Sequence, residues 1–312
     1  MQKKVIDFRP KVDLSIIVIS LSTEKYKTKI YLEKLLKSIR PAIKNISYEF
    51  ILINNSTIDD GTYKLAKEYV RNLVYVERKG VFSFCDNNNL GIKKAHGKYV
   101  LFLNNDTELI DSNIFVEMIN YLNNNEGVGA ISPSLMNSDR KTLQASGGYF
   151  PNLTRVFLWM TLLDNLPFIE VVFNSYHPNK DYYNKKHDQD WVTGAFYMAR
   201  KDNLDKVGGF DEDYGAYVEE VDLSYKIKKL GFRIVYDPKW KVVHIGGMSY
   251  GSESQIIQEF INLKLFYKKH YPKWQLPVLN LIIKLGCILR MIVFSIFKPN
   301  LAKIYAKAFK TV

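Results

Sequence analysis

The residues best suited to chemistry follow a short apolar run. Residues 99–103 end abruptly in Asn104, Asn105, Asp106 and Thr107. The run has the length and the aromatic and β-branched content of a strand buried on both faces. Because ligands of open parallel sheets bind at the carboxyl ends of the strands, this tip suits a divalent cation that grips a diphosphate. The alternative is a strand followed by a helix that Asp106 or Thr107 caps.

A second acidic group lies at the start of a helix expected over residues 219–230, which Gly231 ends. Glu220 shares a face with the apolar residues of this helix and therefore points along its buried stripe. Glu219 and Asp222 lie on the neighbouring polar face, where the helix dipole favours them as solvated or capping charges. A carboxylate in a partly dry cleft is what a general base for a hydroxyl nucleophile requires. The alternative is a helix start without chemistry.

A histidine completes the set of candidate residues. His244 ends an apolar run and precedes two glycines, which permit close approach of the backbone. Imidazole, carboxylate and phosphate oxygen together suit Mn²⁺, and suit Mg²⁺ less well. A structural role at the end of a strand is the alternative. The remaining histidines have no such context and are expected to be ordinary surface residues: His96, His177, His187 and His270.

The elements that must position these residues alternate along the first third of the chain. Apolar runs predict strands at residues 14–20, 50–53, 73–76 and 99–103. Helical spacing predicts helices between them, and the first of these stops before Pro41. This alternation indicates right-handed crossovers and a mostly parallel α/β sheet.

Polar residues end the first two strands as well. Ser20 and Ser22 follow the first strand, and Asn54 and Ser56 follow the second. All of them would meet residues 104–106 in one crevice, which suits a nucleotide held by amide and hydroxyl groups. The glycine-rich dinucleotide fingerprint and the P-loop sequence are both absent, which argues against a P-loop nucleotide hydrolase.

Regular patterning fades between residues 148 and 190, where aromatic residues accumulate. They form either a satellite core under long loops or the wall of an acceptor site, because sugars stack on aromatic faces. Both interpretations stay open at this stage.

The net charge of +12 is concentrated at the carboxyl end. Ten Lys and Arg residues and no Asp or Glu lie between residues 260 and 312, which leaves a net charge of +2 for residues 1–259. A basic tail of this kind favours an anionic surface. Because Lys284 and Arg290 interrupt the apolar stretch 276–297, we expect an amphipathic interfacial segment and no spanning helix. The alternative is a pair of helices that packs on the catalytic part or on a dimer partner.

Cysteine usage and length bound the class of protein. Cys85 and Cys287 lie far apart and lack metal-binding spacing, so a reduced cytosolic setting is expected. No long apolar core of a signal peptide is recognisable near the first residue. A chain of 312 residues has room for one large α/β domain with an appendage, or for two domains.

With these motifs in order, the sequence resembles a family 2 glycosyltransferase of the GT-A fold, in its rhamnosyltransferase-like branch. The resemblance covers residues 12–250. The segments that carry it are LSIIVIS at 14–20, ILINNSTIDDG at 51–61, FSFCDNNNLGI at 82–92, VLFLNNDTEL at 100–109, WVTGAFYMAR at 191–200, GGFDEDYGAYVEEVDLSYKIKKLGF at 208–232 and VVHIGGMS at 242–249.

The resemblance implies a particular organisation of the chain. A Rossmann-like, mostly parallel sheet with flanking helices would form a catalytic domain over residues 1–251. Its nucleotide-binding half would span 12–110 and its acceptor half 111–251. A helical basic tail, associated with a membrane, would follow at 252–312.

The resemblance also implies an inverting, metal-dependent transfer of a sugar from a nucleotide diphosphate donor. Asn104, Asn105 and Asp106 occupy the D-x-D motif, in which Asp106 would bind Mn²⁺ or Mg²⁺. His244 matches the histidine that completes the metal coordination. Glu219-Glu220 matches a Glu-Asp pair whose second member is the general base, and we assign both residues to the catalytic group.

Contacts to the donor are expected from residues in the matched segments and at the strand tips. These are Ser20, Ser22, Asn54, Ser56, Asn89, Asn104, Asn105, Asp106, Trp191 and Gly194. Three positions depart from the family pattern, because Asn104, Asn54 and Glu220 each stand where an aspartate is usual. Together these departures leave room for an inactive relative.

The branch points to dTDP-rhamnose or a UDP-sugar as donor, and to a saccharide or polyprenyl-linked saccharide as acceptor. Cell-surface polysaccharide synthesis at the cytoplasmic face of the plasma membrane is the expected setting. An anionic membrane surface and a second copy of the chain are the expected larger partners, and nucleic acid is not. The alternatives are a catalytically silent nucleotide-sugar binder and a sugar nucleotidyltransferase. The latter needs a glycine-rich basic loop after the first strand, and residues 21–24 do not provide one.

Overall fold

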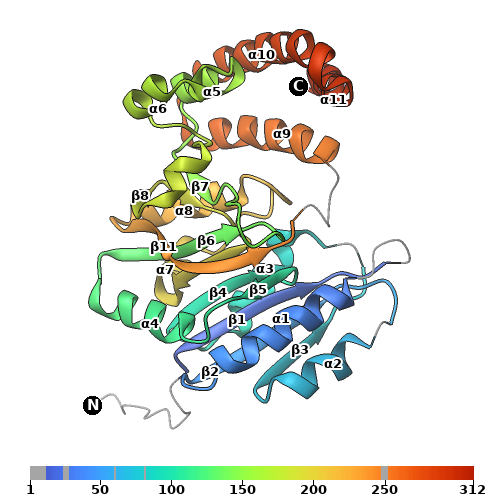
Figure 1. Ribbon diagram of the computed structural model, residues 1–312, viewed down its shortest axis with the longest axis vertical. Helices are drawn as coiled ribbons and strands as arrows, with labels where there is room; N and C mark the ends of the chain where they lie inside the picture. The colour runs from blue at the N-terminus through green and yellow to red at the C-terminus, as the bar shows by residue number, and fades with distance from the viewer. Residues whose placement is uncertain (1–11, 24–27, 60, 81, 247–251) are drawn as a thin grey trace, which may run out of the picture.

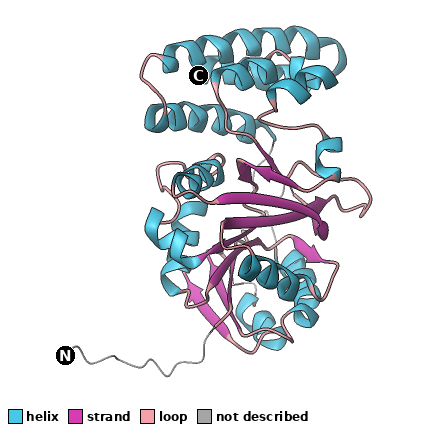
Figure 2. Ribbon diagram, turned by 90° about the vertical axis from the view of Figure 1, so that its left-hand side faces the viewer, coloured by secondary structure: helices cyan, strands magenta, loops and turns pink. Residues whose placement is uncertain are grey.

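The computed structural model describes residues 12–312, apart from 24–27, 60, 81 and 247–251. One end of the molecule holds a mixed β-sheet wrapped by helices, and the other end holds a layer of long helices (Figure 1). Helices cover both faces of the sheet, as the view turned by 90° shows (Figure 2). Asp106 and His244 lie at strand ends of the sheet, and Glu219 and Glu220 begin helix α8 (Glu219–Lys229).

Among the described residues, nine strands form the main sheet in the order β3-β2-β1-β4-β10-β6-β11-β5, with β8 also paired to β11. A separate small sheet joins β7 and β9. The strands are β1 (Leu14–Ser20), β2 (Tyr48–Asn54), β3 (Leu73–Glu77), β4 (Tyr99–Asn104), β5 (Thr107–Leu109), β6 (Val128–Met136), β7 (Gly147–Gly148), β8 (His187–Gln189), β9 (Trp191–Val192), β10 (Phe196–Arg200) and β11 (Arg233–His244).

The first four strands run parallel, as the sequence predicted. Successive residues of a strand point to opposite faces, and here each face meets its own core. Ile17 and Ile51 pack into one apolar cluster, whereas Ile16 and Leu52 pack into the other. Burial on both faces therefore explains why these strands are continuous apolar runs.

Helices connect these strands and extend the molecule. Their bounds are α1 (Lys29–Ala42), α2 (Thr62–Tyr69), α3 (Phe84–Lys94), α4 (Ile114–Asn124), α5 (Leu153–Met160), α6 (Pro167–Phe173), α7 (Lys201–Val207), α8 (Glu219–Lys229), α9 (Ser252–His270), α10 (Gln275–Phe297) and α11 (Pro299–Thr311), with 3₁₀ turns η1 (Leu163–Asn165) and η2 (Lys180–Asn184). The prediction that α1 stops before Pro41 was wrong. Proline in the last turn removes only one helical hydrogen bond, and α1 continues to Ala42.

The alternative of a capped helix after β4 was also wrong. Residues 107–109 form β5, which crosses to the far edge of the sheet and pairs antiparallel with β11. The next helix, α4, begins only at Ile114. Asp106 therefore lies at a junction between two strands.

The aromatic region from 148 to 190 contains more regular structure than its sequence suggested. Helices α5 and α6 form within it. Some of its aromatic side chains are buried, such as Tyr176 and Tyr183, while others, such as Phe157 and Phe168, are exposed. The region is thus partly a satellite core and partly a surface.

The carboxyl-terminal segment is helical, as predicted, but its longest helix differs from expectation. Among the described residues, α10 is the one helix that is long and apolar enough to cross a membrane by length and composition, with a mean hydropathy of 2.0. Arg290 does not interrupt its outer surface, because this side chain is only 6% exposed. The predicted boundary at residue 251 lies outside the described residues. Helix α9, which follows it, contributes Gln255 and Glu259 to the wall of a cavity that also contacts the sheet.

Candidate active site

A cavity of about 460 Å³ opens beside the carboxyl ends of β1 and β4. This volume lies within the range of small-molecule sites. The structure brings eight of the predicted site residues to its wall: Asn104, Asn105, Asp106, Trp191, Gly194, Glu219, Glu220 and His244. The acidic and imidazole groups that the sequence singled out therefore share one cavity.

Backbone pairing brings Asp106 and His244 together, although they are 138 residues apart in the sequence. His244 is the residue opposite Thr107 in the β5–β11 ladder. The backbone N–H of Ile245 donates to the Asp106 carbonyl (3.0 Å), and that of Gly246 donates to Asp106 Oδ2 (3.1 Å). His244 Nε2 consequently lies 3.4 Å from Asp106 Oδ1.

Gln144 fixes the orientation of His244 and makes Nδ1 a hydrogen-bond donor. The Gln144 amide nitrogen donates to the oxygen of Asn137 (2.9 Å) and to the His244 carbonyl (2.6 Å). Its Oε1 is thereby left to accept, and it lies 2.8 Å from His244 Nδ1. With Nδ1–H donating to Gln144, Nε2 is the ring nitrogen that faces Asp106 and the cavity. A proton on Nε2 is shared with the Asp106 carboxylate, and the same nitrogen offers its lone pair to a cation once that proton leaves.

Asp106 is ionised in this setting. Burial opposes its charge, but the hydrogen bond and charge of His244 and the Gly246 N–H more than offset that effect, so the pKa of Asp106 lies below its ordinary value. Among the described residues, no group of three or more His, Cys, Asp or Glu side chains is placed to hold a metal ion. A cation here would take two such ligands from the protein, Asp106 and His244, and the rest from donor and water.

A strained loop delivers the two glutamates at the start of α8. Tyr217 and Val218 both have left-handed backbone angles (φ 67° and 71°), which ordinary residues rarely adopt. Asn262 of α9 holds this loop, because its amide donates to the carbonyls of residues 214, 216 and 217 at 2.7–2.8 Å. The tail helix therefore positions Glu219 and Glu220.

The two glutamates have unequal environments. Burial and the charge of Glu220 raise the pKa of Glu219 well above its ordinary value, so Glu219 keeps its proton. Burial likewise raises the pKa of Glu220 to about 7, although backbone and Glu219 hydrogen bonds favour its charged form. A neutral Glu219 beside a titrating Glu220 is an arrangement suited to a general base. The prediction that Glu219 is solvated was wrong, since it is buried.

Two histidines that were expected at the surface are partly buried and contact carboxylates instead. His177 lines the cavity and lies 2.8 Å from Glu259 of α9. His270 lies 2.6 Å from Asp222, which is fully buried and also pairs with Lys226 at 3.0 Å. Asp222 is thus a structural anchor between α8 and α9 and is not solvated as predicted.

Five predicted donor-binding residues do not line the cavity: Ser20, Ser22, Asn54, Ser56 and Asn89. Ser20 is wholly buried at the end of β1. The backbone N–H of Ser22 donates to Ser56 Oγ (2.8 Å), and the Asn54 amide donates to the Tyr75 hydroxyl (2.8 Å), so these residues tie neighbouring strand ends to each other.

The side chain of Asn89 is bonded within the protein, away from the cavity wall. Its amide exchanges hydrogen bonds with the backbone of Phe210 and donates to Glu212, all at 2.9 Å. It therefore ties α3 to the loop before α8.

Sequence reasoning missed several residues of the cavity wall. Thr28, Asn55, Phe82 and Asn87 lie at its β1–β2 end. Asn55 and Asn87 were within segments already singled out, but only the fold tells which asparagine of a run points inward. Tyr176, His177 and Glu259 lie at the opposite end, and no local pattern marked them.

Comparison with known proteins identifies the family. The sequence model of the family "Glycosyl transferase family 2" matches residues 15–189, which is more than half of the chain. The chain belongs to glycosyl transferase family 2. It is accordingly a glycosyltransferase. The matched segment includes residues 104–106 and extends to the end of β8.

Relatives of known name share about a quarter of their residues with this glycosyltransferase. It is 26% identical to the rhamnosyltransferase WbbL of Escherichia coli over 222 residues, which are 69% of this chain and 78% of that protein. It is also 26% identical to the O-antigen biosynthesis protein RfbC of Myxococcus xanthus over 216 residues, 68% of this chain. The match spans only 16% of the length of RfbC.

A mycobacterial relative matches over a shorter stretch. It is the N-acetylglucosaminyl-diphospho-decaprenol L-rhamnosyltransferase of Mycobacterium tuberculosis, 32% identical over 91 residues, 28% of this chain and 30% of that protein.

Solved structures confirm the GT-A fold. The mannosyltransferase PcManGT of Pyrobaculum calidifontis, in complex with GDP-Man and Mn²⁺, superposes with a TM-score of 0.56 at 14% identity, covering 97% of this chain and 86% of that one. GalNAc-T7 with UDP, GalNAc and Mn²⁺ has a TM-score of 0.56 at 12% identity, covering 84% and 49%. At these identities the likeness establishes the fold.

The raised pKa of Glu220 predicts a pH-dependent stability. Between the ordinary carboxyl value and about 7, the folded state holds a proton that the unfolded state releases, so stability falls as the pH rises through this window. Glu220→Gln imitates the protonated form. We therefore expect the variant to have a higher Tm than the wild type at about pH 8 and nearly the same Tm at about pH 5.

Thermal unfolding followed by circular dichroism at both pH values makes this comparison. Glu68→Gln, at an exposed position of α2, is the matched control and leaves the Tm unchanged at each pH. A Glu220→Gln variant less stable than the wild type at the higher pH would contradict the burial of an ionisable carboxyl here.

Proposed function

We propose that this glycosyltransferase moves a sugar from a nucleotide diphosphate donor to a hydroxyl group of a saccharide, with the help of a divalent cation and with inversion at the anomeric carbon. The observation that supports this most is the convergence of Asp106, His244 and Glu220 on one cavity wall, although three separate segments supply them. Ion-binding groups and a base with a raised pKa are the two parts that such a transfer needs.

Asp106 and His244 are the residues that would hold the cation. Asp106 is ionised, and His244 Nε2 lies 3.4 Å from its Oδ1, so that a cation between them would take the place of the proton on Nε2. An imidazole beside a carboxylate suits Mn²⁺ better than Mg²⁺, which prefers oxygen ligands alone. When bound, the cation supplies positive charge that stabilises the departing nucleoside diphosphate. Asn104 replaces the first carboxylate of the D-x-D motif, and its amide nitrogen lies 3.4 Å from His244 Nε2.

Glu220 is the residue that would activate the acceptor. Its carboxylate would take the proton from the acceptor hydroxyl as the oxygen attacks the anomeric carbon. Glu219 keeps its own proton and donates to Glu220, which holds the base in place and favours its charged form. A single displacement from the face opposite the leaving diphosphate inverts the anomeric centre.

The two ends of the cavity differ in a way that suits a donor and an acceptor. Thr28, Asn55 and Phe82, near the ends of β1 and β2, offer hydroxyl, amide and aromatic contacts for a nucleoside. Tyr176 and Trp191 line the wall near Glu220, with ring centroids 5.7 Å apart. Aromatic faces of this kind suit the apolar side of a sugar ring.

The names of the relatives guide the choice of substrates. WbbL and the mycobacterial enzyme are named rhamnosyltransferases, and the latter's name specifies a polyprenyl diphosphate-linked acceptor. For this chain they favour dTDP-rhamnose, with UDP-sugars as the next donors to test, and a lipid-linked saccharide acceptor in cell-surface polysaccharide synthesis. That acceptor would place the enzyme at the cytoplasmic face of the membrane.

Glu220→Gln tests the assignment of the base. The variant should bind donor as the wild type does but turn over about 10²- to 10⁴-fold more slowly, which is the usual contribution of general-base catalysis. Release of nucleoside diphosphate in the presence of acceptor measures turnover. In the wild type this rate should rise with pH through about 7, because the base must lose its proton first. Glu68→Gln is the control, and full activity of Glu220→Gln would remove this residue from the mechanism.

Asp106→Ala tests the cation site. Without this carboxylate, binding of the nucleotide sugar should no longer depend on Mn²⁺, as isothermal titration calorimetry with and without the ion will show. Asp111→Ala, at an exposed position shortly after β5, should behave as the wild type. Mn²⁺-dependent donor binding without any transfer in the wild type would instead identify a catalytically silent binder.

A further inference from the structure

One side of α10 carries a continuous apolar stripe that no other described element covers. Its residues recur every three or four positions and are 38–73% exposed: Val278, Leu281, Leu285, Ile288, Ile292 and Ile296. At 3.6 residues per turn, this spacing places them on one side of the helix. Trp274, at the amino-terminal end of α10, is 62% exposed and extends the same stripe.

Arg290 lies on the opposite side of α10 and holds the helix against the rest of the molecule. Its guanidinium donates to the carbonyl of Met160 (3.1 Å), to that of Trp159 and to the hydroxyl of Tyr305 (2.6 Å). Its charge therefore points inward, and the stripe itself is uncharged. The same contacts argue that α10 lies along a surface, since a spanning helix would carry this arginine into hydrocarbon.

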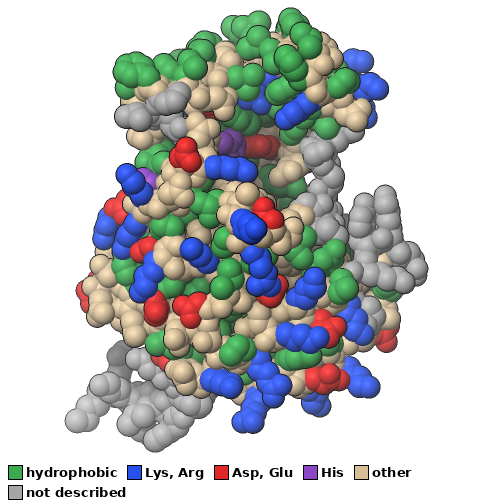
Figure 3. Space-filling model, viewed as in Figure 1, with side chains coloured by type: hydrophobic (Ala, Val, Ile, Leu, Met, Phe, Trp, Pro, Cys, Tyr) green, Lys and Arg blue, Asp and Glu red, His purple; other side chains and the backbone are tan. Residues whose placement is uncertain are grey.

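A second segment, more than 100 residues away in sequence, adds to this apolar surface. Helix α5 packs against α10, and α6 lies beside it at the same end of the molecule (Figure 1). The exposed apolar side chains of this segment are Phe157, Leu163, Leu166, Phe168, Val172 and Phe173. Hydrophobic side chains gather over α5, α6 and α10 at this end of the molecule (Figure 3).

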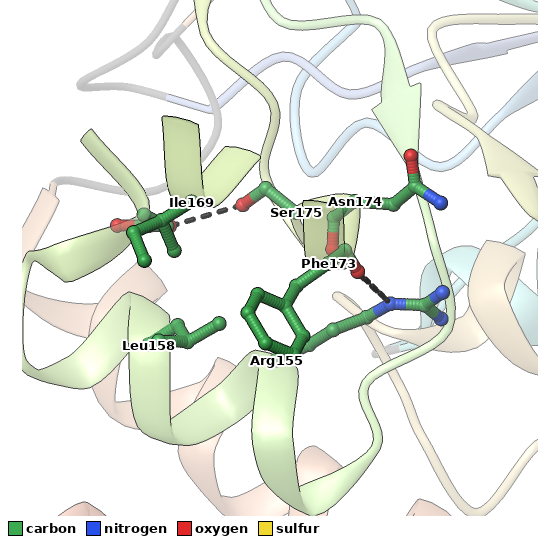
Figure 4. A pocket seen from close by; sticks show the side chains of 7 residues that line it. Arg155, Leu158, Ile169, Phe173, Asn174 and Ser175 are labelled. Atoms are coloured by element: carbon green, nitrogen blue, oxygen red, sulfur yellow. Dashed lines mark hydrogen bonds between the residues drawn. The ribbon is translucent and has the colours of Figure 1, made fainter. Parts of the chain in front are cut away.

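The α5–α6 segment is fixed in place. Arg155 Nε donates to the carbonyls of Phe173 and Asn174, both at 3.2 Å, and Ser175 Oγ donates to Asp164 Oδ2 at 3.0 Å (Figure 4). These bonds hold the polar groups of the segment inward. Phe168, 75% exposed on α6, therefore projects from an ordered part of the structure, and its exposure needs an explanation.

The charges around this surface indicate its partner. Exposed lysines lie on α10, at the junction after it and on α11, which packs against α10: Lys284, Lys298, Lys303, Lys307 and Lys310. Acidic residues are absent from 260–312. A symmetric dimer through this face would bring the two sets of lysines together, whereas an anionic lipid surface would neutralise them. Apolar insertion beside basic residues is the pattern of interfacial membrane proteins.

We infer that α5, α6 and α10 form one membrane-docking face, which inserts Phe168 and the α10 stripe into the interface of an anionic bilayer. The cavity opens beneath this face, since His177 on its wall contacts Trp159 of α5, and Glu259 on its wall belongs to α9. Figure 3 shows acidic and histidine side chains in a hollow there. Only the further point, that the face presents the cavity to a lipid-linked acceptor, rests on the proposed function.

Vesicle flotation of the full chain tests the inference. Vesicles containing phosphatidylglycerol should capture the wild type, and vesicles of phosphatidylcholine alone should capture much less. Phe168→Glu on α6 and the double substitution Leu285→Glu with Ile292→Glu on α10 should each reduce the captured fraction by about tenfold or more, because they put charge into the interface. Ile30→Glu, at an exposed apolar position of α1 (58% exposed), should float as the wild type does.

Quenching by brominated acyl chains provides a second measurement. Tryptophan fluorescence of the wild type should fall on vesicles that carry the brominated lipid, and Trp274→Phe should lose most of this response. Capture of Phe168→Glu equal to that of the wild type would exclude α6 from the face. Absence of capture, or a wild-type dimer that these variants convert to monomer without lipid, would overturn the inference in favour of a second copy.

Donor binding separates this inference from the proposed function. Calorimetry with nucleotide sugar and Mn²⁺, without vesicles, should give the wild-type affinity for every surface variant. Lost flotation with intact donor binding thus reports on the face alone. Lost donor binding in the wild type would contradict the proposed function and leave the flotation result to stand by itself.

Discussion

The pairing of β5 with β11 is the constraint on which the rest of the site depends. Asp106 ends one apolar strand, and the short β5 that follows it must cross to the far edge of the sheet to find a partner. That partner is the end of β11, so His244 arrives opposite Thr107 and its ring faces the Asp106 carboxylate. Backbone hydrogen bonds, which hold position more firmly than flexible side chains do, thereby set the distance between the two candidate ligands.

The electrostatics of the cavity follow from how each acidic group is supported. Asp106 receives an N–H and faces an imidazole, and its pKa falls despite burial. Glu219 and Glu220 stand together at a dry helix start, and their pKa values rise. Neighbouring carboxyls with opposite shifts can carry out different tasks in one site. Helix α9 stabilises the position of Glu220, because its Asn262 bonds the strained loop before α8. The tail therefore belongs to the catalytic unit.

The sequence predicted those features that local pattern determines. Apolar runs with polar tips identified the parallel strands and correctly placed Asp106 beyond the carboxyl end of one of them. Helical spacing identified α8 with Glu220 in its first turn. Features that depend on packing between distant segments were not predictable. The bond of Asn89 to Phe210 is one example, because the two residues lie 121 positions apart in the sequence. The place of Glu259 in the cavity wall was likewise not predicted, because only the packing of α9 brings it to His177.

The central claim is that one cation site between β4 and β11 faces the glutamate of α8 across a single cavity. Anomalous diffraction from crystals of the full chain, grown with Mn²⁺ and thymidine or uridine diphosphate, tests it most directly. We predict a manganese peak at coordination distance, about 2 Å, from an Asp106 oxygen and from His244 Nε2, with the diphosphate between that peak and Glu220. A nucleotide seated in the cavity with manganese bound away from both residues would contradict it.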